Sequence, residues 1–121
     1  MLPLLLPTAI PTAFGQTVLT VDRSRGSYTA TIGAVADCHA STACTFATVD
    51  GEAGHVNRRG RRAVGLANGT TAWFEEHACG ANCAGSATLV FQRAGSRYTI
   101  AVKAGTLAQT VQIANGLRAK H

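Results

Sequence analysis

Four cysteines in a chain of 121 residues constrain the fold more than any other feature of this sequence. Aromatic residues make up only 6% of the chain, so few large side chains are available to build a core. An even number of cysteines in a small domain with a thin core indicates disulfides, which persist in oxidising compartments. We therefore expect a single disulfide-bonded domain in an exported protein, located in the periplasm or outside the cell.

The cysteines are Cys38, Cys44, Cys79 and Cys83, and sequence alone leaves three pairings open. We favour Cys38 with Cys44 and Cys79 with Cys83, because each pair flanks a turn-rich loop between two predicted strands. Crossed pairings would close longer loops and restrict the unfolded chain more strongly, but local geometry decides between the pairings.

A zinc site is the alternative interpretation of the same residues, since His39 and His77 lie close to the cysteines in the sequence. Structural zinc sites usually separate paired cysteines by two to four residues. Only the Cys79–Cys83 spacing falls in that range, and a redox-active Cys-x-x-Cys pair is absent from the sequence. We therefore expect no bound metal and no cofactor.

The pattern of the remaining residues favours β-structure. Thirteen glycines and a charged fraction of 14% suit short strands joined by turns better than a helical bundle. Segments with strand composition cover residues 17–22, 27–35, 44–49, 63–66, 70–75, 88–92 and 96–103. The Asn68-Gly69 pair predicts a hairpin turn, whereas residues 53–62 show no periodicity and predict a long exposed loop.

A change of period near the C-terminus predicts one amphipathic helix. Leu107, Val111, Ala114 and Leu117 recur at helical spacing, and Thr106 is a suitable N-cap. We predict an α+β fold, in which a curved antiparallel sheet of about six strands packs against one C-terminal helix.

The first fourteen residues differ from the rest of the chain. Pro3, Pro7 and Pro11 exclude a continuous helix, so we expect residues 1–14 to form an apolar, Pro-rich extension that lies across one sheet face, and residues 15–121 to form the domain. The segment lacks the basic start of a signal peptide, so any leader would lie upstream or export would follow another route. No apolar run is long enough for a transmembrane segment.

Basic residues are concentrated in one place. The formal net charge is +5, and four of the eleven basic residues are Arg58, Arg59, Arg61 and Arg62. We interpret this run as a solvated loop, with contact to a phosphate, nucleic acid or anionic lipid as the alternative. A nucleic-acid module would spread its basic residues over a face with interleaved aromatic residues, so we expect no nucleic-acid partner.

Catalytic chemistry has little support in the sequence. The six acidic residues are scattered over turns and strand ends and form no recognisable catalytic set, so we do not expect an enzyme. Trp73 and Phe74 are adjacent in one predicted strand and must face opposite sides of the sheet. We expect one of them in the core and the other under the N-terminal segment, with availability to a ligand as the alternative.

Several segments together resemble an uncharacterised family of bacterial exported proteins. They are the Leu-Pro-rich start at 4–11, the two cysteine pairs, and residues 98–103 and 111–116. The C-terminal helix is similar to one that closes a group of envelope and sporulation-linked domains, which are distant relatives of half-barrel lipoprotein carriers. The resemblance supplies no catalytic residues. It implies a non-catalytic binding or interaction module of the cell envelope whose partner is an envelope protein or an apolar ligand; the alternative is a metal-binding or enzymatic domain that uses the Cys/His clusters.

Overall fold

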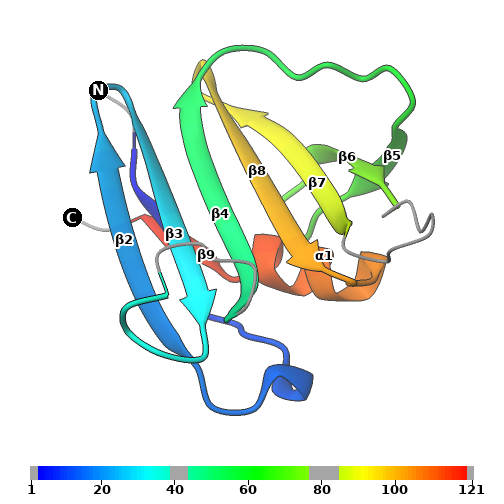
Figure 1. Cartoon of the computed structure of the whole chain (residues 1–121). Helices are drawn as coiled ribbons and strands as arrows, with labels where there is room; N and C mark the ends of the chain where they lie inside the picture. The colour runs from blue at the N-terminus through cyan, green and yellow to red at the C-terminus, as the bar shows by residue number, and fades with distance from the viewer. Residues whose placement is uncertain (1–2, 39–43, 77–84, 120–121) are drawn as a thin grey trace.

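The computed structural model describes residues 3–38, 44–76 and 85–119, and within them the chain has an α+β fold (Figure 1). Seven antiparallel strands form one open sheet in the order β2-β3-β4-β8-β7-β6-β5. Their bounds are β2 (Val18–Ser24), β3 (Ser27–Gly33), β4 (Thr45–Ala53), β5 (Arg62–Gly65), β6 (Thr71–Glu75), β7 (Ser86–Arg93) and β8 (Ser96–Lys103). The predicted fold class is confirmed, and each of the seven segments with strand composition contributes one strand to this sheet.

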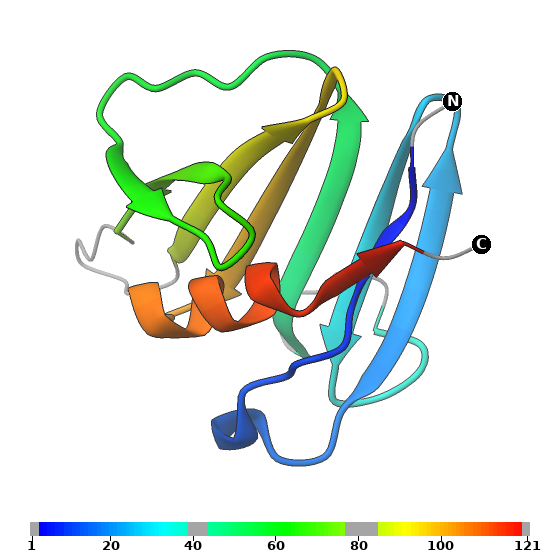
Figure 2. The same cartoon turned by 180° about the vertical axis from the view of Figure 1, so that it is seen from behind.

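A second, two-stranded sheet was not predicted. It pairs β1 (Leu5–Pro7) with β9 (Leu117–Ala119), which bring the two ends of the chain together. The remaining elements are a short 3-10 turn, η1 (Thr12–Phe14), and the helix α1 (Leu107–Asn115). Figure 2 shows α1, β1 and β9 on the same side of the large sheet. We call this side the concave face and the opposite side the outer face.

Alternation along the strands builds the core on the concave face. Tyr98, Ile100 and Val102 of β8 are fully buried, and their register partners on β7 are Phe91, Leu89 and Ala87. These positions share one face because successive side chains of a strand point to opposite sides. β7 and β8 therefore present one common apolar face to the core.

The helix begins and ends for local reasons. The Thr106 hydroxyl accepts from Gln109 N while the Gln109 side chain accepts from Thr106 N, which is the capping box expected of a Thr N-cap. A Cβ added at Gly116 would lie 2.6 Å from the Cβ of Ala9, so glycine allows the N-terminal segment to approach closely at the point where the helix ends. The chain then continues as β9, and the helix is shorter than the sequence suggested.

The buried face of α1 differs from the predicted one. Thr110 and Ile113 are fully buried and Ala114 nearly so, whereas Leu107 and Val111 are only half-buried. Both sets have helical spacing and share Ala114, so periodicity does not separate them. Thr110 can be buried because its hydroxyl donates to Leu107 O at 2.8 Å. The predicted stripe was therefore wrong at its first half.

Two tyrosines hold the N-terminal segment on the concave face. The Tyr28 hydroxyl donates to Leu5 O at 2.8 Å and accepts from Leu5 N at 3.1 Å, and the Tyr98 hydroxyl donates to Pro3 O at 2.8 Å. Leu5 is 1% exposed and belongs to the core. Burial raises the pKa of Tyr28 to about 12. The segment thus lies across a sheet face, as the sequence indicated, and it closes the concave side of the core.

Candidate functional site

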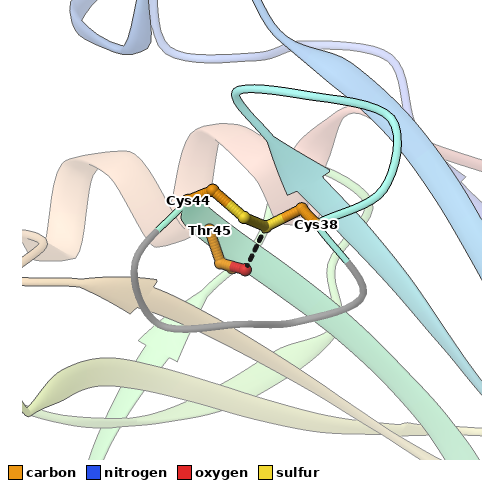
Figure 3. Close-up of a disulfide and its surroundings, with 3 residues drawn as sticks. All are labelled: Cys38, Cys44 and Thr45. Atoms are coloured by element: carbon orange, nitrogen blue, oxygen red, sulfur yellow. Dashed lines mark hydrogen bonds between the residues drawn. A yellow bond between two sulfur atoms is a disulfide. The ribbon is translucent and has the colours of Figure 1, made fainter.

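Of the candidate site residues, the first cysteine pair forms a disulfide (Figure 3). Cys38 and Cys44 are joined with a Cα–Cα distance of 5.7 Å, and the Cys38 sulfur lies 3.0 Å from the Thr45 hydroxyl. A Cβ added at Gly33 would lie 2.9 Å from the Cβ of Cys38, so the bridge packs directly on the end of β3. The predicted Cys38–Cys44 pairing is confirmed.

The second cysteine pair cannot be placed. Cys79 and Cys83 lie outside the described residues, as do His39 and His77. Within residues 3–38, 44–76 and 85–119, no three His, Cys, Asp or Glu side chains are arranged to hold a metal ion. Because Cys38 and Cys44 are disulfide-bonded, their sulfurs are not available as thiolate ligands.

The arginine run divides between the two faces of the β5–β6 hairpin. Arg58 lies over the ring of Trp73, 4.8 Å from its centroid, and Arg62 lies over the ring of Phe74 at 5.6 Å. Trp73 and Phe74 are neighbours in β6 and point to opposite sides of the sheet. The run therefore contacts the hairpin through two arginine side chains, while Arg58 and Arg62 themselves remain exposed, as expected of a solvated loop.

Arg61 adds a third contact between the run and the sheet. Its guanidinium Nη1 donates to the Thr88 hydroxyl at 2.9 Å, and Thr88 lies opposite Glu75 of β6 in the register of the strands. Arg59 differs, because its backbone N donates to the Asn57 side chain at 3.0 Å and, among the described residues, its guanidinium contacts no aromatic ring or hydrogen-bond partner. The four arginines therefore have different roles despite their similar position in the sequence.

Arg58 and Trp73 line a cleft of about 780 Å³ on the outer face. The other residues that line it are His55, Val56, Thr70, Thr71 and Gln92. The cleft thus combines one indole face, one guanidinium, an imidazole, an amide and two hydroxyls. A mixture of an aromatic surface and a few polar groups is typical of ligand sites.

Hydrogen bonds anchor the loop that forms one wall of this outer cleft. His55 Nδ1 lies 3.3 Å from Gln92 Nε2, and Arg97 Nη1 donates to His55 O at 3.1 Å. Arg97 also forms an ion pair with Glu52 at the end of β4. These contacts connect His55, in the loop between β4 and β5, to β7 and β8. Figure 1 shows the course of this loop.

The sequence failed to identify this cleft because its two main residues are far apart in the chain. The loop that contains Arg58 has no aromatic neighbour in sequence, and Trp73 comes from a later strand. The expectation that the N-terminal segment covers the second aromatic residue was also wrong, because that segment lies on the concave face whereas Trp73 faces outward. The only feature of the sequence that pointed to this cleft was the adjacency of Trp73 and Phe74 in one strand, which places one of them on the outer face.

On the concave face, the chain's own side chains fill the space against the sheet. Leu5, Ile113 and Leu117 pack there into the core cluster. A smaller hollow of about 380 Å³ remains between the β5–β6 hairpin and β9, and Arg93 and Arg118 are among its lining residues. The outer cleft is therefore the better candidate for a binding site.

Comparison with protein-family models, curated proteins and solved structures finds no significant match to this chain. Among the helices that the structure describes, none has the length and apolar character needed to cross a membrane. The candidate site therefore has to be argued from its own geometry.

Proposed function

We propose that this protein is a non-catalytic binding module of the bacterial cell envelope, and that its outer cleft holds an anionic group of the ligand. The observation that carries the proposal is the Arg58 guanidinium placed over the half-buried Trp73 ring, 4.8 Å from its centroid, in an open cleft. Export to the periplasm or the cell surface is part of the proposal, and the Cys38–Cys44 disulfide supports it because such bonds persist in oxidising compartments.

The position of Arg58 suggests the chemistry of the ligand. A guanidinium over an indole makes its ring contact through its face, and its N–H groups can bind a carboxylate or phosphate through two parallel hydrogen bonds. The ring contact itself is worth about 0.5–1 kcal/mol at an exposed site and restricts the arginine before binding. The ligand that fits best carries a carboxylate or phosphate that reaches Arg58, with His55 and Gln92 near its other polar groups.

The alternative proposal, a metal-binding or enzymatic domain that uses the Cys/His clusters, has less support. Two of its four sulfurs are joined to each other in the Cys38–Cys44 disulfide. A partner that is an apolar ligand is also less well supported, because α1, β1 and β9 fill the concave face.

The single tryptophan of the chain makes the proposal simple to test, because Trp73 fluorescence reports on the outer cleft alone. We suggest titrating the protein with a galacturonate hexamer, which carries carboxylates, and separately with a glycerol phosphate oligomer. The methyl ester of the galacturonate hexamer is the uncharged control. We expect a saturable change of Trp73 fluorescence with at least one of the two anions, weaker at high salt and absent with the ester.

Two matched variants assign the binding to Arg58. Arg58→Ala should weaken binding at least about tenfold, since a charge-assisted hydrogen bond contributes about 1.5–3 kcal/mol. Arg59→Ala removes the same charge from the neighbouring residue outside the cleft and should change affinity less than twofold. Equal affinity of both variants, or no saturable change with either anion, would overturn the proposal.

A further inference from the structure

The two edges of the large sheet differ in a way that points to a partner. β2 forms one edge with seven residues, and its pairing with β3 is unbroken from Val18 to Ser24. β5 forms the other edge with only four residues. Edge strands in monomeric proteins are usually short, bulged or interrupted by proline, because an open edge can pair with another strand. β2 is neither short nor bulged and holds no proline, and its edge protection is limited to the charged residues Asp22 and Arg23.

Exposed apolar side chains gather at the same edge. Val18, Val21 and Val35 are the large hydrophobic residues that the structure describes as exposed, at 37%, 36% and 48%. The first two lie in β2, and Val35 lies just beyond the end of β3. At the opposite end of the sheet, β5 contains one large apolar residue, Val64, which packs against the core. The apolar exposure thus coincides with the long edge.

Alternate residues of β2 have backbone N–H and C=O groups that could pair with an added strand. Ser24 and Ser27 flank a two-residue turn. The two residues of such a closing pair exchange backbone hydrogen bonds with each other. Because hydrogen-bonded and non-bonded pairs alternate, the N–H and C=O groups of Leu19, Val21 and Arg23 point away from β3. An added antiparallel strand would pair with these groups.

We infer that this edge is a homodimer interface, in which β2 of one copy pairs antiparallel with β2 of a second copy, centred on Val21. This register uses the whole strand and places Val21 opposite Val21, Leu19 opposite Arg23, and Thr20 opposite Asp22. Centring the pair on Asp22 or Arg23 would instead place like charges opposite each other, which destabilises a cross-strand pair. The strand is therefore complementary to a second copy of itself in this register.

The pairing joins the two sheets into one continuous sheet with their outer faces on the same side, because the two-fold axis is perpendicular to the sheet. The inference does not depend on the ligand of the outer cleft. An interface of one strand from each copy is small, so the dimer should be weak and concentration-dependent.

Sedimentation equilibrium of the full chain over a range of concentrations tests the inference. The chain mass is 12.5 kDa, and the weight-average mass should rise toward twice this value at high concentration. Val21→Lys places a charge at the centre of the pair and should give a monomer at every concentration. Ala63→Lys adds the same charge to the β5 edge and should dimerise like the parent.

A second variant separates loss of dimer from loss of fold. Val21→Pro removes an N–H that points away from β3, and proline is tolerated on edge strands at such positions. It should be monomeric, with a circular dichroism spectrum like that of the parent. A parent that stays monomeric throughout, or folded Val21 variants that dimerise as well as Ala63→Lys, would overturn the inference; the first result would leave this edge to a strand from a different protein.

Discussion

The two faces of the sheet are built from different residues and are completed in different ways. On the concave face, fully buried apolar side chains such as Ile100 and Leu89 meet the chain's own helix and N-terminal strand. The outer face is rich in threonine, and Trp73, which lies opposite Val90 on that face, is covered in part by Arg58 from a loop. The concave face is thus covered by the chain's own elements, whereas the outer face has a cleft that a ligand can reach.

This difference explains where a function can reside. The concave face carries most of the hydrophobic stabilisation, so a ligand that entered it would have to displace β1, β9 or α1. Changes on the outer face remove little buried apolar area, so that face can vary with little effect on stability. The four predictions below test this division in order of decreasing effect on the free energy of unfolding.

The largest effect is expected at Ile113, on the helix face that packs on the sheet. Ile113→Asp would bury a charge without a partner in a site that is 0% exposed, and it should cost several kcal/mol of stability. Gln112→Asp changes the neighbouring, exposed position of the same helix and should shift the free energy of unfolding by less than about 0.5 kcal/mol. Thermal or urea unfolding of both variants measures the difference. Similar melting of the two would mean that α1 does not cover the core.

The second effect concerns the disulfide at the end of β3. Replacing Cys38 and Cys44 together by Ser removes a short loop constraint from the unfolded chain, worth about 2 kcal/mol in the chain-entropy model. Urea unfolding of this double variant should show a lower midpoint with a similar slope. An unchanged midpoint would show that the bridge adds nothing to the folded domain.

The first two predictions also show what could be learned from sequence. The Cys38–Cys44 pair and the hairpins of β5–β6 and β7–β8 follow from local signals, namely short loops, Asn68-Gly69 and strict alternation. The buried helix face did not follow, because two overlapping stripes share Ala114 and only the sheet selects between them. The β1–β9 pair and the Arg58–Trp73 contact depend on residues far apart in the chain, and no periodicity records such contacts.

The third prediction concerns Tyr28, which ties the N-terminal strand to the concave face. Tyr28→Phe removes two hydrogen bonds to Leu5 and leaves its backbone N–H and C=O without these partners, so we expect a loss of about 1–2 kcal/mol. The hydroxyl also predicts a pH dependence. Its pKa is raised from 10.0 to about 12, chiefly by desolvation, so the folded state holds its proton where the unfolded state releases it.

The stabilisation by Tyr28 is therefore complete below pH 10 and is lost as the pH rises toward 12. The difference in unfolding free energy between the parent and Tyr28→Phe, measured across this range, should shrink with increasing pH. Taking the difference between the two proteins removes the contribution of the lysines and arginines that they share. A difference that is constant from pH 9 to 12 would contradict a buried, neutral Tyr28.

The smallest effect is expected on the outer face and has the opposite sign. Thr31 of β3 points outward but is 0% exposed, and its hydroxyl oxygen is buried with no hydrogen-bond partner. A buried hydroxyl without a partner destabilises the folded state, and valine has the same branched shape and a higher tolerance for burial. Thr31→Val should therefore stabilise the domain by about 1 kcal/mol or less.

Thr48 lies opposite Thr31 on β4 and is half-buried, so Thr48→Val is the matched control and should change little. Differential scanning calorimetry should show a higher melting temperature for Thr31→Val alone. If Thr31→Val melts below the parent, the hydroxyl has a partner such as a buried water, and this part of the outer face is more tightly organised than the division between the two faces implies.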